Sequence, residues 1–241
     1  VFDRDRAMAT DIDKAPEALQ QLVADADTGG RKPQGLTRQI IFGVALAWAL
    51  FQTWYASPLP FALGWGILND TEARAIHLAF ALFLSFAAWP AFKRSPRDRV
   101  PAIDWLLAGL AAFAGAYIML FYAQLATRPG QPTPMDIAVS VVGLVLLLEA
   151  TRRAIGWPMA ALAVIFLAYC MAGPWLPDVL AHKGASLNRL MSHMWLTTEG
   201  VYGIALGVSA GTIFVYVLFG SLLDRAGGGN YMMQVSFAAL G

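Results

Sequence analysis

The amino-acid sequence predicts an all-α membrane protein, with about six helices that span the bilayer and one amphipathic helix at its surface. The first observation behind this prediction is composition. Of the 241 residues, 58% are hydrophobic and only 14% are charged, whereas a soluble domain carries about 25% charged residues. The second observation is that the apolar residues form six long runs without the alternation of barrel strands. Such runs favour helices, because a helix pairs its backbone groups within one segment.

The N-terminal 38 residues are polar and charged, and they lack the apolar core of a secretory signal peptide. Pro16 and Glu17 are suited to open a short helix with Leu19 and Leu22 on one side. The stretch TGGRKPQG then ends this helix. We therefore predict a cytoplasmic tail over residues 1–38 that carries one weak amphipathic helix.

The six apolar runs are close to the roughly 20 residues that a helix needs to cross the hydrocarbon core. The first and fourth runs are shorter, so their polar flanks are expected to complete the crossing. The runs occupy residues 40–55, 75–92, 105–125, 137–148, 157–176 and 201–223. A buried helix of a soluble protein would explain any one run, but six in succession favour a multi-pass membrane protein.

Acidic or hydroxyl side chains stand near the predicted start of three spans. Asp104 and Asp136 each follow a proline closely, where a carboxylate stabilises a helix N-terminus through capping and the helix dipole. A proton-relay role for these two acids is the alternative. The second span is expected to be capped by Asp70 or Thr71.

The histidines and the single cysteine show no catalytic or metal-binding pattern. Arg74 and His77 lie one turn apart near the start of the second span, and we interpret both as surface anchors. His182 and His193 have no metal-ligand spacing to any acid, so no metal site is predicted. Cys170 lies in an apolar run and is interpreted as a small packing residue.

The stretch LLLEATRRAIGWP, between the fourth and fifth runs, predicts a tight cytoplasmic hairpin. An arginine at mid-bilayer costs about 2.5 to 3.5 kcal/mol, so Arg152 and Arg153 are expected at the membrane surface. Glu149 lies one helical turn before them, a spacing at which it pairs with either arginine. Gly156 is expected to end the fourth helix and Pro158 to start the fifth.

The distribution of lysine and arginine sets the predicted orientation, because these residues resist crossing the bilayer. If every run crosses, all but four of the 17 lysines and arginines fall on one side. The four exceptions are Arg74, Arg128, Lys183 and Arg189. The basic side is the cytoplasmic one, so the N-terminus is predicted to be cytoplasmic.

The longest loop on the outer side contains the stretch SLNRLMSHMWL. Within it Leu187, Leu190, Met191 and Met194 fall at helical spacing, and Ser186 is placed to cap the helix. This pattern predicts an amphipathic helix that lies in the membrane interface.

The sixth run differs from the others in its small residues. Gly203, Gly207 and Gly211 recur at every fourth position, which in an apolar helix allows close approach of another helix. Ser209 and Thr212 add hydroxyl groups to this segment. Helix packing or contact with a transport domain is the favoured interpretation of Gly203, Gly207, Ser209 and Gly211. An ion or substrate site built from hydroxyls and backbone is the alternative.

The motifs of the common enzyme classes are absent from the sequence. It contains no Ser/His/Asp constellation, HExxH motif, phosphate-binding glycine loop or dinucleotide fingerprint. We therefore predict neither an enzyme nor a cofactor, and no machinery for nucleotide hydrolysis. The formal net charge of +1 gives no indication of a nucleic-acid partner.

Four stretches, taken in order, resemble the fused membrane component of tripartite ATP-independent periplasmic (TRAP) transporters, of the type served by a TAXI-family binding protein. They are LVADADTGGRKPQG, RAIHLAFALFLSF, LEATRRAIGWP and LTTEGVYGIALGVSAGTIFVYVLFGSLLDRAGGG. GIALGVSAG departs from the family, which often has a proline after the first glycine-isoleucine. Together the stretches touch nearly the whole chain.

The resemblance implies a division of the chain after the hairpin. Residues 39–155 would form a four-helix scaffold like the family's small subunit, and residues 156–241 would supply the opening helices of the large transport subunit. In this family the large subunit moves a transport domain against a scaffold, and its ion and substrate sites carry Ser-Gly-Ser and Asn motifs. Those motifs are absent here. The site for a coupling Na+ or H+ would therefore lie outside this segment.

The resemblance also implies the partners and the location. The chain would lie in the bacterial inner membrane as a permease that imports a small organic anion, a carboxylate, by symport with a cation. Its partners would be the lipid bilayer, the remainder of the large transport subunit and a periplasmic substrate-binding protein. Because a new helix begins after RAGGGN, we expect the chain to be the front part of a longer protein.

The main alternative is a non-transporting membrane anchor or assembly subunit. Such a protein would bind partners through its glycine-lined helix and its amphipathic helix. A membrane enzyme is less favoured, because no pair of histidines or acids is evident within the predicted spans.

Overall fold

The protein is described here by a computed structural model that covers residues 29–92 and 94–240, and in this part of the chain all regular elements are helical. Six helices are long and apolar enough to cross a membrane. They are Gly35–Ala56, Asp70–Ala88, Ala102–Leu120, Pro134–Ala154, Trp157–Trp175 and Ile204–Arg225. The predicted all-α class with six spans is confirmed, and the chain is a multi-pass helical membrane protein. The short helix predicted from Pro16 onward lies outside the described residues.

The first four spans are the single helices α2 (Gly35–Ala56), α4 (Asp70–Ala88), α5 (Ala102–Leu120) and α7 (Pro134–Ala154). The fifth is α8 (Trp157–Ala172), prolonged by the 3₁₀ turn η1 (Gly173–Trp175). The sixth is made of α10 (Ile204–Val208), the π turn η2 (Ser209–Ile213) and α11 (Phe214–Arg225). The connecting helices are α3 (Leu59–Leu63), α6 (Tyr122–Ala126), α9 (Leu187–Trp195) and the last helix, α12 (Gly228–Leu240).

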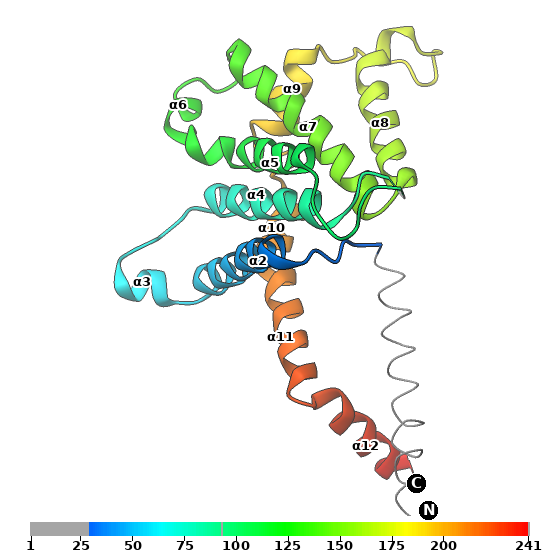
Figure 1. The fold of residues 1–241 in the computed structure, drawn as a ribbon. Helices are drawn as coiled ribbons and strands as arrows, with labels where there is room; N and C mark the ends of the chain where they lie inside the picture. Colours follow the sequence, from blue (N-terminus) through cyan, green and yellow to red (C-terminus); the bar gives the residue numbers. More distant parts are fainter. Residues whose placement is uncertain (1–28, 93, 241) are drawn as a thin grey trace, which may run out of the picture.

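Helix α4 forms the centre of the bundle, between α2 and α5 (Figure 1). Its contact with α5 is close at small residues: a Cβ on Gly115 of α5 would lie 3.1 Å from the backbone of Ala79 on α4. Larger side chains such as Leu82 and Phe86 fill the space beside them. Small residues allow helix backbones in a membrane to approach closely, and van der Waals contact then holds them together.

Helix α9 packs against α7 and α8, so protein covers much of the apolar face that was expected to lie in the membrane interface, including Leu190 and Met191. Trp195 anchors it, with a fully buried indole whose Nε1 donates to the Ala114 carbonyl at 3.0 Å. Gly143 makes room for this ring, because a Cβ there would lie 2.3 Å from it. The hydroxyl of Tyr202 donates to Gly115 at 2.9 Å, and burial raises the pKa of this hydroxyl, which stays neutral.

The start of α4 differs from the prediction that Asp70 or Thr71 caps it. Asn69 is the cap, since its side chain accepts from the Glu72 amide at 2.9 Å and Glu72 accepts from the Asn69 amide at 2.9 Å. This reciprocal pair is a capping box. Asp70 is instead the first helical residue, and its carboxylate accepts from the Tyr55 hydroxyl at 2.9 Å.

The polar segments between the spans gather at two ends of the bundle. We call one of them the basic end: it comprises residues 29–34, the loop between α4 and α5, and the hairpin between α7 and α8. The Arg31 amide donates to the Ala88 carbonyl there at 2.7 Å. At the opposite end, Arg74 donates to the Tyr202 carbonyl at 3.0 Å. These three segments, all predicted to be cytoplasmic, therefore lie together.

The last two helices, α11 and α12, run away from the bundle (Figure 1). No residue of α11 is buried within the chain. Large apolar side chains, including Tyr216, Val217 and Phe219, are exposed along it. This segment therefore relies on lipid or on further protein to cover its apolar surface.

Candidate functional site

The sixth span is broken inside the bundle by the π turn at Ser209–Ile213. A π turn displaces backbone groups from the regular α-helical ladder, and such turns are frequent at functional sites. The side chain of Gln52 on α2 reaches this turn, and its Nε2 donates to the Ala210 carbonyl. Gln52 is fully buried, and its Oε1 atom has no hydrogen-bond partner among the described residues.

His77 on α4 connects the same turn to α2. Its Nδ1 lies 3.2 Å from Trp48 Nε1, and its Nε2 lies 3.3 Å from the Ser209 hydroxyl. The indole N–H can only donate, so Nδ1 accepts and the ring proton resides on Nε2. The imidazole of His77 therefore joins three separate elements as a neutral group.

The interpretation of His77 as a surface anchor is wrong, because the residue is only 4% exposed. The sixth span covers it, and this contact joins positions 132 residues apart in the sequence. Aromatic rings complete the enclosure: Phe214 packs against Trp48 with 5.0 Å between ring centroids, and against His77 with 5.9 Å. Periodicity within one helix does not reveal a partner this distant.

The residues singled out in the sixth span have different surroundings. A Cβ on Gly207 would lie 2.8 Å from the guanidinium of Arg74, and Ser209 contacts His77. Gly203 is the N-cap of α10, where a Cβ would meet a backbone carbonyl at 2.8 Å. A Cβ on Gly211 would meet nothing within 4 Å. The π turn takes up an extra residue, so the glycines do not form one continuous packing stripe.

The hairpin residues form a chain of ion pairs at the basic end. Glu149 accepts from Arg152 Nε and from Arg153 Nε, each at 2.7 Å, as their spacing predicts. Arg153 Nη1 also donates to Asp104 at 2.8 Å, and Asp104 is paired in turn with Arg31. The Arg153 side chain is 3% exposed, so it is buried within the protein between Glu149 and Asp104.

Arg31 and Asp104 were not expected to join the hairpin. Arg31 closes the C-terminus of α4, since its Nη1 donates to the Phe86 carbonyl at 2.9 Å. Asp104 stands in the first turn of α5 as predicted, but its carboxylate is shared by two arginines. The available signal was that an acid stood among basic segments predicted on one side of the membrane. Gly156 reverses the chain here with φ of +120°, a conformation that favours glycine.

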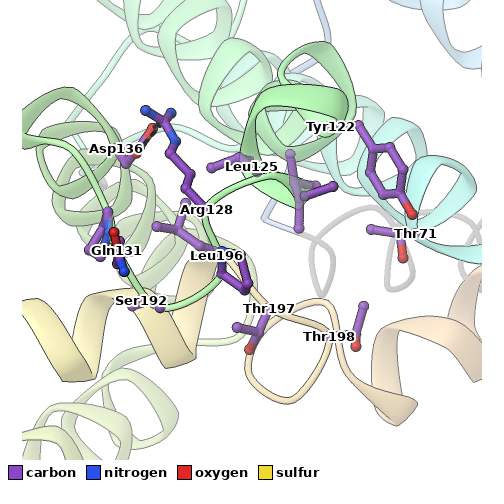
Figure 2. A pocket seen from close by; sticks show the side chains of 15 residues that line it. Thr71, Tyr122, Leu125, Arg128, Gln131, Asp136, Ser192, Leu196, Thr197 and Thr198 are labelled. Atoms are coloured by element: carbon purple, nitrogen blue, oxygen red, sulfur yellow. Dashed lines mark hydrogen bonds and ion pairs between the residues drawn. The ribbon is translucent and has the colours of Figure 1, made fainter.

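A cavity of about 350 Å³ opens at the opposite end, where α4, α5, α6, α7 and α9 meet (Figure 2). Hydroxyl groups line it, and the Arg128 side chain reaches toward Asp136, with a shortest ion-pair distance of 3.0 Å. Asp136 also accepts from the Tyr117 hydroxyl at 2.6 Å and from the Thr133 amide at 2.7 Å. Asp136 thus completes a capping box with Thr133 at the start of α7.

Across residues 29–92 and 94–240, no cluster of three or more His, Cys, Asp or Glu side chains is arranged to hold a metal ion. His182 contacts the Tyr169 carbonyl at 3.1 Å, and His193 lies 3.4 Å from Glu199. Cys170 is partly buried beside the core.

Comparison of the chain with protein-family models, with curated proteins and with solved structures found no match.

Proposed function

We propose that the chain is a membrane component of a binding-protein-dependent secondary transporter of the bacterial inner membrane. The transporter imports a small organic anion, a carboxylate, with the energy of a Na+ or H+ gradient. This segment acts mainly as its scaffold. The six apolar spans support a permease, and the four sequence stretches that resemble TRAP transporters support this class of permease.

One observation carries the proposal: ion pairs and side-chain packing link the helices of the bundle to one another, whereas the sixth span, which contains a π turn, extends away from it. Ion pairs at the basic end link residues 29–34, α5 and α7, and α9 braces α7 at the opposite end. The sixth span leaves this bundle at its π turn, and α11 has no buried residue. A rigid body joined to a mobile part through a discontinuous helix suits alternating access.

In the division of labour that the resemblance implies, α8 and α9 belong to the second part of the chain and pack against α7 of the first. Residues 39–155 act as the fixed scaffold, and residues 156–241 begin the part that carries the transport domain. The remainder of the large subunit covers the exposed apolar side of α11. The periplasmic binding protein delivers the anion to the outer side.

Uptake by reconstituted protein tests the proposal. The natural full-length protein is placed in proteoliposomes, and labelled small carboxylates are added with the purified binding protein and a Na+ or H+ gradient. We expect uptake that requires the binding protein and that stops when an ionophore collapses the gradient. Uptake that needs ATP and ignores ion gradients overturns the proposal. Absence of uptake, while the protein binds another membrane partner, overturns it in favour of an anchor.

A further inference from the structure

We propose that His77 is a proton-binding site within the membrane, and that its proton controls how firmly the sixth span is held against α2 and α4. This inference goes beyond the transport function and does not depend on it. It rests on hydrogen-bond polarity, on a buried acceptor without a partner and on the position of the π turn.

The first step is that the observed contacts require a neutral imidazole. Trp48 Nε1 carries a proton and has no lone pair to offer, so His77 Nδ1 must be unprotonated to accept from it at 3.2 Å. The remaining ring proton on Nε2 then points to the Ser209 hydroxyl at 3.3 Å. In this state one uncharged ring holds α2, α4 and η2 together.

The second step is that protonation of Nδ1 breaks this arrangement. The imidazolium donates from both nitrogens, so two N–H groups would face each other across the Trp48 contact. Among the described residues no carboxylate is paired with His77 to compensate the charge. The ring is too buried for water to do so, at 4% exposure. A proton on His77 therefore forces a rearrangement of its partners.

Charged and titratable groups on the neighbouring elements are either paired with residues other than His77 or exposed. The sixth span brings no charged side chain to His77, because its first 20 residues carry none. On α4 itself, Arg74 is held by Asp70 at 3.1 Å and by backbone carbonyls. The groups on α2, α5 and α7 pair as Tyr55 with Asp70, Tyr117 with Asp136, Asp104 with Arg153, and Glu149 with Arg152, while Arg38 is exposed.

The third step is that α2 already carries the acceptor that the charged form needs. Gln52 lies one helical turn from Trp48 and therefore on the same side of α2. It is fully buried, yet within the described part of the chain its Oε1 has no hydrogen-bond partner. A buried acceptor without a partner costs stability. We assign Gln52 Oε1 as the acceptor for the new N–H of protonated His77.

The fourth step links the proton to the break in the helix. The other end of the same amide, Nε2, holds the Ala210 carbonyl in the π turn. When the amide turns toward His77, this contact loosens and Trp48 is released from the imidazole. Phe214 follows the π turn and packs on the rings of Trp48 and His77, so it then loses the packing contact that these two rings provide. Proton uptake from water at His77 therefore frees α10 and α11, and proton loss restores the closed contact.

Histidine NMR tests the first two steps in the full chain in lipid nanodiscs. The chain has three histidines, so the substitutions His182→Gln and His193→Gln leave His77 as the only signal. We expect ¹⁵N shifts of the neutral Nε2–H form near about pH 8, and titration on lowering the pH toward about 3, a range that also covers the tails of histidine titration at buried positions. The Trp48 indole signal should move in the same titration. An Nδ1–H form, absence of titration, or an unmoved Trp48 signal overturns the proposal.

Spin-label distances test the last two steps. Leu46→Cys on α2 and Val217→Cys on α11, both at exposed positions, carry the labels in a Cys170→Ser background. We expect a narrow distance distribution at high pH that shifts and broadens at low pH. His77→Gln, which keeps a neutral donor and acceptor, should abolish this response.

Matched tryptophan variants complete the design. Trp48→Phe removes the opposed N–H and should reduce the pH response, whereas Trp175→Phe, at an exposed site, should leave it unchanged. A low-pH shift that persists in the His77→Gln protein overturns the proposal. So does a distance that ignores pH while His77 titrates.

Discussion

At the scale of single residues, Asp104 shows how one carboxylate organises the basic end. It accepts from Arg153 at 2.8 Å and is paired with Arg31, and all three side chains are nearly inaccessible to solvent. An isolated buried charge is expensive, so the three groups depend on each other. Arg31 lies 73 residues from Asp104 in the sequence. The pair therefore fixes the polar segment before α2 against the bundle.

Replacing Asp104 with Asn should therefore destabilise the protein strongly. Two buried guanidinium groups would lose their acid, and breaking such a pair costs about 3–5 kcal/mol. The free energy of unfolding, measured by denaturant titration in bicelles, checks this expectation. Asp98→Asn is the control, since Asp98 lies in the loop just before α5 and is exposed. Equal stability of the two variants would contradict the assignment of Asp104.

Gly143 is the second residue whose role is specific. A methyl group added there would lie 2.3 Å from the buried Trp195 ring. We expect Gly143→Ala to cost about 1–3 kcal/mol, because overpacking forces side chains out of their rotamers. Gly109→Ala is the matched control, since a Cβ there meets nothing within 4 Å, and it should change stability by no more than about 1 kcal/mol. A stable Gly143→Ala protein with α9 still docked would refute this packing.

At the scale of elements, the π turn of the sixth span is fixed in place by contacts with the neighbouring helices α2 and α4. Gln52 is the buried polar residue of α2, and it bonds a carbonyl in the π turn. Ser209 adds a second tie through His77. The apolar surroundings make these few polar contacts decisive, because an unpaired polar group is costly there.

Gln52→Leu removes the donor to the Ala210 carbonyl at similar side-chain volume. An unsatisfied buried carbonyl costs about 1–3 kcal/mol, although this change also removes the unpaired Oε1 atom. We expect faster amide hydrogen exchange at residues 209–214 and lower stability. Gln39→Leu is the control on the exposed side of α2. Unchanged exchange in the Gln52 variant would show that the π turn does not depend on this contact.

The hairpin between α7 and α8 gives a prediction about insertion. Changing Arg152 and Arg153 together to Glu should misorient or expel α7 and α8, because this change removes the basic flank that is predicted to keep this end in the cytoplasm. It also leaves Asp104 facing a like charge. Cysteine accessibility on both sides of the membrane measures the outcome. The double change to Lys should keep the topology and lower stability, since Lys cannot form the bidentate contact.

The sequence predicts both the number of spans and the hairpin, because both depend on residues that are close together in the chain. Apolar length and a local charge cluster are properties of neighbouring residues, so Glu149 is correctly paired with Arg152 from its spacing alone. The link from Arg153 to Asp104 joins helices that the sequence separates, and no local period reports it. His77 was misread because the segment that buries it lies 132 residues away. The predicted cap of α4, Asp70 or Thr71, lies one or two residues after the observed cap, because Asn69, Asp70 and Thr71 are all good capping residues.

At the scale of the whole molecule, the structure sorts the inter-span segments into a basic end and an opposite end. The N-terminus of α2, the C-terminus of α4, the start of α5 and the end of α7 meet at the basic end. The first four spans, α2, α4, α5 and α7, alternate in direction and give this result, and an omitted span among them would mix the two ends. The proposed scaffold role requires this alternation, since the binding protein and the cytoplasmic tail must lie on opposite sides.

Cysteine accessibility in oriented membrane vesicles tests this central claim most directly. Single cysteines are introduced in a Cys170→Ser background as Arg99→Cys and Ile155→Cys at the basic end, and as Leu63→Cys and Val179→Cys at the opposite end; all four positions are exposed. An impermeant maleimide should label the first two only from the cytoplasmic side and the last two only from the outside. Labelling of both pairs from the same side would contradict the six-span topology and the scaffold built on it.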